Sequence, residues 1–175
     1  MIDFSRSWFK TKSAIWLEEV DGVKIPNEQE ISQKLEDFKS KASKIDGISN
    51  VTTKTDFDNY VFIIKLNYAN LKALNAVVNT INNQRDQIHF SGSGKNFERI
   101  ASYPIPEKVV NDPKKKKDLE EASIIAIYSF DKDILSVNNS NSKISANKKT
   151  VFLKQSMYSV LKKSTLMNNT IQLKP

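Results

Sequence analysis

The sequence predicts an α+β fold: an antiparallel sheet of about six to eight strands, built from hairpins, with about three or four helices packed on one face. Apolar residues recur every three or four positions in two stretches, which is the helical period. In several other stretches they recur at every second position, which is the strand period. Neighbouring strand-like stretches are separated by short turns, as in antiparallel hairpins.

The clearest helix is predicted to follow Asn27 and to run for about 17 residues. Asn27 can cap this helix, and Glu30 three residues later completes a capping box. One apolar stripe is formed by Ile31, Leu35, Phe38, Ala42 and Ile45. Gly47 stands where a left-handed residue would end the helix.

A hairpin and a second helix come next. Residues 51–57 and 60–68 alternate between apolar and polar side chains on either side of the turn dipeptide Asp58-Asn59. Asn70 can cap the following helix. Its apolar face consists of Leu71, Leu74, Val77, Val78 and Ile81.

The second half of the chain is predicted to be mostly strands. Residues 88–90 and 96–103 form a hairpin around Ser-Gly-Ser-Gly at 91–94, and a short helix is one option after Asp118. Further strands are expected at 123–130, 134–137, 151–153 and 170–173, with a helical turn or two at 157–163. Residues 104–118 and 138–149 are expected to be irregular loops within one globular domain, residues 1–175.

The predicted core draws on both halves of the chain. It comprises Ile31, Leu35, Phe38, Val61, Ile63, Leu74, Val77, Ile125, Ile127, Phe152 and Leu161.

Composition excludes several classes of function. The chain has 175 residues, no cysteine and one histidine, His89. Thiol chemistry, disulfides, cysteine-ligated zinc and iron–sulfur clusters are therefore excluded. The longest apolar runs fall far short of the roughly 18 to 20 residues that span a bilayer.

The net charge of +7 suits an anionic partner, and the run Lys114–Lys117 is its densest part. These lysines could contact anionic lipid headgroups, at about 1 kcal/mol per basic residue, or a phosphate backbone. The acidic residues Asp118, Glu120 and Glu121 follow at once and could neutralise part of the field, which leaves a solvated surface as the alternative. Only three arginines occur, which argues against base-specific recognition of nucleic acid.

Two tryptophans, Trp8 and Trp16, lie in a weak helical pattern over residues 2–20. Tryptophan favours half-wet environments, so these residues could contact a partner or a membrane interface. The alternative is a terminal element packed on the core.

No pattern predicts a catalytic site, a metal or a cofactor. Ser-Gly-Ser-Gly at 91–94 lacks the Lys-Ser/Thr ending of a phosphate loop, and a strand is expected after it. His89 has no second histidine to share a metal with. The carboxylate pairs are interpreted as turn or surface residues: Glu18-Glu19, Asp56 with Asp58, Glu120-Glu121, and Asp131 with Asp133.

Several segments resemble small Bacteroidetes-type envelope lipoproteins of unknown function. They are Pro-Asn-Glu-Gln-Glu-Ile at 26–31, Lys-Ile-Asp-Gly-Ile-Ser-Asn-Val at 44–51, Asp-Phe-Asp-Asn-Tyr-Val-Phe at 56–62, residues 127–137 and Asn-Asn-Thr-Ile-Gln-Leu at 168–173. The resemblance implies export, a removed signal peptide and an acylated cysteine at the mature N-terminus. The sequence itself shows neither signal nor cysteine, and the resemblance carries no functional residues.

Three functional hypotheses follow. The first is a non-catalytic envelope protein, periplasmic or on the surface, that binds or assembles with an unknown partner and reaches the membrane only through a lost N-terminal lipid. The second is a cytosolic basic module that binds nucleic acid or an acidic protein. The third is an enzyme with a carboxylate site around Asp56, Asp58 or Glu98.

Overall fold

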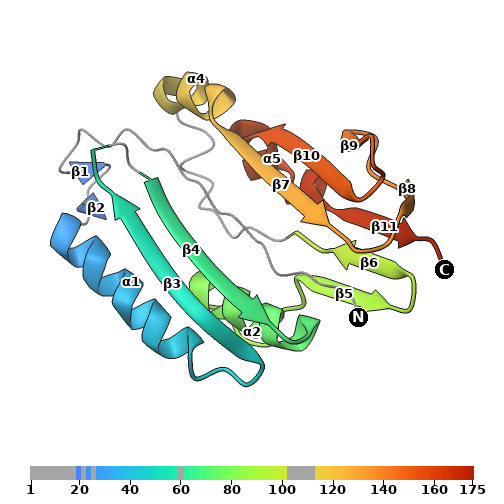
Figure 1. The fold of residues 1–175 in the computed structure, drawn as a ribbon. Coiled ribbons are helices and arrows are strands. Elements are labelled where there is room, and N and C mark those ends of the chain that lie inside the picture. The colour runs from blue at the N-terminus through green and yellow to red at the C-terminus, as the bar shows by residue number, and fades with distance from the viewer. Residues whose placement is uncertain (1–18, 21–22, 25–26, 59–60, 102–112) are drawn as a thin grey trace. The chain divides into compact units, whose positions relative to one another are not determined.

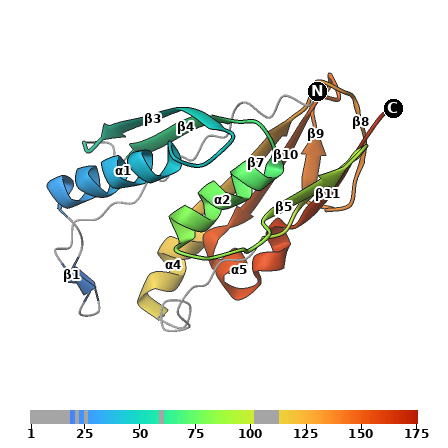
Figure 2. The same cartoon turned by 90° about the horizontal axis from the view of Figure 1, so that it is seen from below.

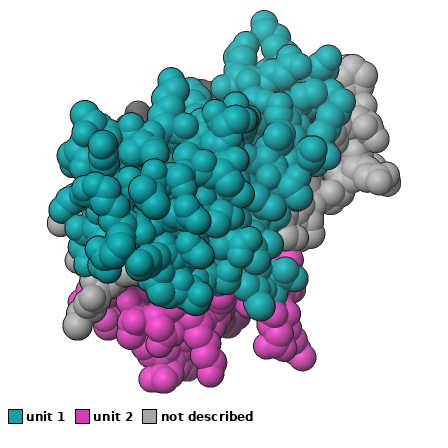
Figure 3. Space-filling model, turned by 90° about the vertical axis from the view of Figure 1, so that its right-hand side faces the viewer, with its two compact units in different colours: residues 1–4, 87–175 teal, residues 5–86 magenta. Residues whose placement is uncertain are grey.

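The computed structural model describes residues 19–20, 23–24, 27–58, 61–101 and 113–175. Helices and strands are both abundant and every described strand pair is antiparallel, which confirms the α+β class (Figure 1). Contacts group the chain into two compact units, residues 1–4 with 87–175 (unit 1) and residues 5–86 (unit 2), coloured separately in Figure 3.

The described strands form four small antiparallel sheets rather than the single sheet of about six to eight strands that was predicted. In unit 1, strands that lie far apart in the sequence pair with one another. The hairpin of unit 2 forms a sheet of its own, because its two strands pair with each other.

Unit 2 is a hairpin with two helices. Its elements are β1 (Glu19–Val20), β2 (Val23–Lys24), α1 (Glu28–Ala42), β3 (Ile48–Asp56), β4 (Val61–Tyr68) and α2 (Leu71–Asn82). Helix α1 contacts β3 and α2, and α2 contacts β4 (Figures 1 and 2). The two helices therefore pack against each other and against the hairpin.

Local capping determines where these helices begin. The Asn27 side chain accepts from the Glu30 backbone N–H at 2.9 Å, and Glu30 accepts from the Asn27 N–H at 2.9 Å, so the capping box is confirmed. Asn70 caps α2 through the Ala73 N–H at 2.9 Å. Helix α1 ends at Ala42, earlier than predicted, and Gly47 (φ +81°) instead serves the turn before β3, where a Cβ would lie 3.2 Å from the Cβ of Ala73.

Unit 1 is built on two antiparallel sheets. Its elements are β5 (Phe90–Ser93), β6 (Asn96–Arg99), α4 (Pro113–Glu121), β7 (Ser123–Ser129), β8 (Ile134–Val137), β9 (Ser142–Ile144), β10 (Thr150–Ser156), α5 (Met157–Lys162), the 3₁₀ helix η1 (Ser164–Met167) and β11 (Asn169–Leu173). One sheet has the order β7-β10-β9, and the other β5-β6-β11-β8. Neither order follows the chain, so each sheet needs strands from distant segments.

Apolar side chains join the two sheets of unit 1. One buried cluster consists of Ala101, Leu153, Val160 and Met167, with Ile124 and Ala126 packed against it. The Phe97 ring of β6 lies 5.3 Å from the Tyr128 ring of β7 and 5.6 Å from that of Phe130, centroid to centroid. Alternate residues of β7 and β10 therefore point into this core.

Both predicted loops were partly wrong. Residues 104–112 lie outside the described residues, but α4 begins at Pro113, where proline is tolerated because a first-turn N–H has no helical partner. Within 138–149, residues 142–144 form β9. The Asn139 amide anchors this segment by donating to the carbonyl oxygens of Leu166 (3.0 Å) and Asn168 (2.7 Å).

Part of the predicted core was also wrong. Leu74 and Val77 are buried as expected, but Ile125, Ile127 and Phe152 are 46%, 53% and 37% exposed. They alternate with the inward residues of β7 and β10, so their position in the strands places them on the opposite face. Five other predicted core residues are half-buried: Ile31, Leu35, Phe38, Ile63 and Leu161. The side chain of Val61 lies outside the described part of the structure.

The two faces of the β7–β10 pair should respond differently to substitution. Leu153→Ala removes a fully buried side chain and should lower the free energy of unfolding by about 2 to 5 kcal/mol. Ile127→Thr keeps a β-branched side chain on the exposed face and should cost less than about 1 kcal/mol. Urea denaturation of both variants measures the difference, and similar losses would contradict the assignment of faces.

Candidate functional site

The outward-facing side of the β7-β10-β9 sheet carries a group of large apolar side chains beside two lysines. We call Ile125, Ile127, Phe152, Lys143 and Lys154 the outer face. Phe152 of β10 is directly opposite Ile127 of β7 and Lys143 of β9, and Lys154 is opposite Ile125. Directly opposite side chains in an antiparallel pair lie about 4.5 to 5.5 Å apart at Cβ, so these five form one contiguous surface.

Alternation along the strands explains why these residues face outward. On β10, Val151 and Leu153 are fully buried, whereas Phe152 and Lys154 between and after them are exposed. On β7, Ile124 and Ala126 pack against the core cluster. Ile125 and Ile127 therefore share the side of Ser123 and Ser129, which are both exposed.

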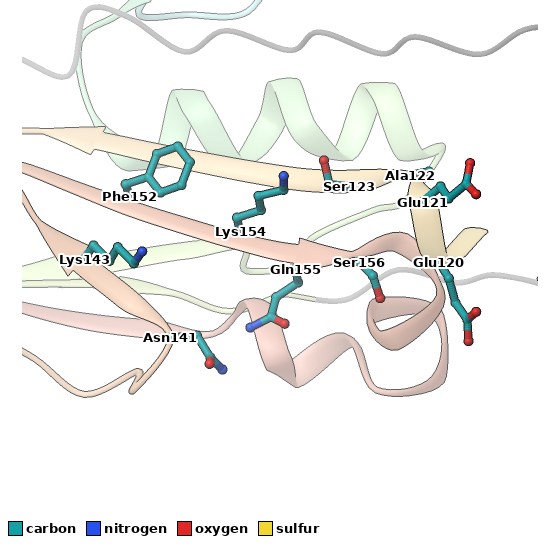
Figure 4. Close-up of a pocket in the computed structure, with 10 residues that line it drawn as sticks. All are labelled: Glu120, Glu121, Ala122, Ser123, Asn141, Lys143, Phe152, Lys154, Gln155 and Ser156. Atoms are coloured by element: carbon teal, nitrogen blue, oxygen red, sulfur yellow. The ribbon is translucent and has the colours of Figure 1, made fainter. Parts of the chain in front are cut away.

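A hollow of about 440 Å³ adjoins the outer face. Strand β9 pairs with Val151–Leu153, so among the described strands the last residues of β10 have a neighbour only in β7. Figure 4 shows Phe152 and Lys143 towards one end of the hollow and Glu120 and Glu121 at the other, with Lys154 between. The hollow is also lined by Ala122, Ser123, Asn141, Gln155 and Ser156.

The hollow separates opposite charges along its length. Lys143 lies at one end and Lys154 in the middle, while the Glu120 Oε1 atom at the other end lies 3.8 Å from the Lys116 Nζ atom of its own helix. The Nε2 atom of Gln155 is buried and has no hydrogen-bond partner within the described residues. The surface of the hollow therefore combines apolar side chains and cations with carboxylates at its far end.

The predicted lysine run belongs to helix α4 and is not a four-lysine loop. Lys116 is paired with Glu120 and also lies 5.6 Å from the Tyr158 ring centroid of α5, with Lys162 on the same ring at 4.6 Å. Lys117 is exposed, and the side chains of Lys114 and Lys115 lie outside the description. Lys116 and Lys162 therefore both lie beside the Tyr158 ring, and Glu120 partly neutralises the charge of Lys116.

The other predicted candidates are dispersed. Trp8 and Trp16 lie outside the described residues. Glu98 accepts from the Ser91 hydroxyl at 2.9 Å, and Asp133 pairs with Lys174 at 3.1 Å. Among the residues that the structure describes, no group of three or more histidine or carboxylate side chains could hold a metal ion.

His89 is fully buried directly before β5, within the fold rather than at a surface. The Arg99 guanidinium donates to the His89 carbonyl oxygen at 2.9 Å and to that of Ile100 at 2.8 Å, and it lies 4.6 Å from the Phe90 ring centroid. Burial, and then the positive charge of Arg99, lower the pKa of His89 below its ordinary value of 6.5. Both features fit a structural role in the β5–β6 hairpin.

The apolar residues of the outer face, Ile125, Ile127 and Phe152, were missed as site residues because they were expected in the core. A signal was present in the sequence: Lys154 is two residues from Phe152, and two residues along a strand share a face. Ser123 and Ser129 mark the side of Ile125 and Ile127 in the same way.

Comparison with known proteins provides no family assignment. The chain matched no family model, no curated protein and no solved structure. In the described part of the chain, no helix is long and apolar enough to cross a membrane.

The lowered pKa of His89 predicts a pH-dependent stability. The unfolded state binds a proton near pH 6.5 and the folded state only at lower pH, so stability is full above pH 6.5 and falls as the pH drops towards the folded pKa. Urea midpoints measured between pH 7.5 and pH 5 should fall more steeply for the wild type than for His89→Gln. Equal slopes would contradict this linkage.

Proposed function

We propose that the protein is a non-catalytic binding or assembly module whose outer face docks a protein partner. The observation that carries this proposal is the exposure of Ile125, Ile127 and Phe152 side by side on one sheet face. Contiguous exposed apolar surface is costly in water and is typical of interaction sites. Covering it contributes about 25 cal/mol for each Å² removed from water.

The partner surface follows from the charges around the apolar group. Lys154 lies beside Ile125, and Lys143 lies beside Phe152. A segment with apolar side chains in its centre and carboxylates towards its ends complements this arrangement. The lysines would then provide orientation and specificity, and the apolar contacts most of the affinity.

A displayed library of random peptides, selected on the full-length protein, tests this proposal. We expect the selected peptides to combine apolar residues with Asp or Glu, and Phe152→Ser to weaken their binding at least tenfold. Leu135→Ser is the matched control, because Leu135 is a 61% exposed apolar residue on β8, away from the outer face.

Charge reversal provides the second arm of that experiment. Selection on Lys154→Glu should shift the enriched peptides from acidic towards basic residues, because the charge of the peptide must complement the charge at residue 154. Peptides that bind wild type and Phe152→Ser equally well would overturn the proposal.

A second candidate function is binding of an anionic partner, nucleic acid included, at the α4–α5 surface. The specific observation is the arrangement of Lys116 and Lys162 around Tyr158, with Lys117 and Lys163 exposed nearby in the chain. Binding of a duplex or single-stranded oligonucleotide should then weaken steeply with salt, and Lys162→Ala with Lys163→Ala should reduce the salt slope by about one to two units. Absence of binding at low salt would remove this candidate.

We also propose an envelope location with an N-terminal lipid tether, which is supported only by the resemblance to envelope lipoproteins. Mass spectrometry of the native protein's N-terminus tests it, because an acylated cysteine adds a lipid mass that a cytosolic chain lacks.

A further inference from the structure

We propose that β7 pairs with β7 of a second copy, antiparallel, about a two-fold axis at Ala126, so that two outer faces become one. This inference rests on the proposed function, because the second copy would extend the outer face that the proposed function uses for binding. The occupant of the β7 edge is thus another molecule of this chain.

Strand β7 is an uncharged edge strand with which another strand could pair. It ends the order β7-β10-β9, and no strand of the described residues pairs with its other side. Its seven residues include no charge, no proline and no bulge, whereas the opposite edge strand, β9, has three residues and carries Lys143. Natural edge strands are normally kept short or charged because an open edge recruits other strands.

The hydrogen bonds at the two ends of β7 show which backbone groups face that edge. The Phe130 N–H donates to the Lys149 carbonyl at 2.9 Å, and the Ala122 carbonyl accepts from the Met157 N–H at 2.8 Å. Because antiparallel pairs alternate between bonded and non-bonded residues, the even-numbered residues of β7 bond to β10. The N–H and carbonyl groups of Ser123, Ile125, Ile127 and Ser129 consequently point away from β10.

The sequence of β7 is nearly the same in both directions. It is Ser-Ile-Ile-Ala-Ile-Tyr-Ser, with Ala126 in the middle. Antiparallel pairing about Ala126 places Ile125 opposite the partner's Ile127 and Ser123 opposite the partner's Ser129. A two-fold interface requires this kind of self-complementarity, and each bonded pair exchanges two hydrogen bonds.

This pairing doubles the outer face. Across the extended sheet, one row reads Lys143, Phe152, Ile127, the partner's Ile125 and the partner's Lys154, and the two-fold axis repeats it. Each row is apolar in its centre and cationic at both ends. The dimer therefore presents a longer site of the same chemistry than either copy alone.

Charge repulsion does not oppose this arrangement strongly. The lysine positions on the two β10 strands lie three strand spacings apart, about 14 Å. That separation exceeds the Debye length of about 8 Å at physiological salt. No charged residue of β7 is brought to the new contact, so the net charge of +7 on each copy acts mainly at long range.

Sedimentation of the full chain tests the proposal. We expect the wild type to reach twice its 19.9 kDa mass with rising concentration. Ile127→Lys places a charge at the edge and should raise the dimer dissociation constant at least tenfold. The matched control Leu135→Lys, an equally drastic change on β8, should leave dissociation unchanged.

Single cysteines test the register, since the chain has none of its own. Two copies of Ala126→Cys would form a non-bonded pair with Cα atoms about 4.5 Å apart, within the range for a disulfide. Two copies of Ser123→Cys would lie about 20 Å apart, six residues along the strand. Oxidation should cross-link the first variant and not the second, and the reverse result would overturn the pairing.

Failure of this inference is distinguishable from failure of the proposed function. A wild type that stays monomeric at all concentrations overturns the dimer, whether or not selected peptides still depend on Phe152. Phe152→Ser should lose those peptides and still dimerise, because Phe152 lies on β10, one strand away from the new contact. A wild type that forms only aggregates larger than a dimer also overturns the two-fold pairing.

Discussion

The register between β7 and β10 is the constraint on which the rest of unit 1 depends. Leu153 has no exposed surface, and Tyr128 packs on Phe97 of the other sheet, so these strands have one inner face. A shift by one residue would exchange the two faces completely. The same register that buries Leu153 therefore leaves Phe152, Ile125 and Ile127 outside, and the core and the outer face are two consequences of one pairing.

Hydrogen bonds of three polar side chains, those of Asn139, Asn168 and Arg99, hold together other parts of unit 1. The Asn139 amide donates to the carbonyl oxygens of Leu166 (3.0 Å) and Asn168 (2.7 Å), which holds the segment after β8 to the chain around η1 and β11. The Asn168 side chain accepts from the Ala101 N–H at 2.7 Å. Arg99 stabilises the β5–β6 hairpin by donating to the His89 carbonyl oxygen and lying 4.6 Å from the Phe90 ring centroid. These contacts link the loops and the hairpin of unit 1 to one another, and the apolar residues and lysines of the outer face take no part in them.

Much of the local structure was predictable, because its causes lie within a few residues. The capping box of Asn27 and Glu30 involves partners three residues apart, and the cap of Asn70 on α2 has the same span. The candidate site was not found, because a run such as Ile124–Tyr128 is apolar at nearly every position. Periodicity cannot assign faces within such a run, although Ser123 and Ser129 at the ends of β7 and Lys154 on β10 do indicate the outward sides.

The sequence by itself determined the α+β class, the starts of helices α1 and α2 and most strand positions, because hydrogen bonds and turns of short range select them. Only the tertiary structure decided that β7 pairs with β10, that β11 lies between β6 and β8, and which side of each strand is buried. Those choices depend on residues far apart in the chain, such as Phe97 and Tyr128, whose contact forms only when both sheets are assembled. The outer face is what this assembly leaves uncovered.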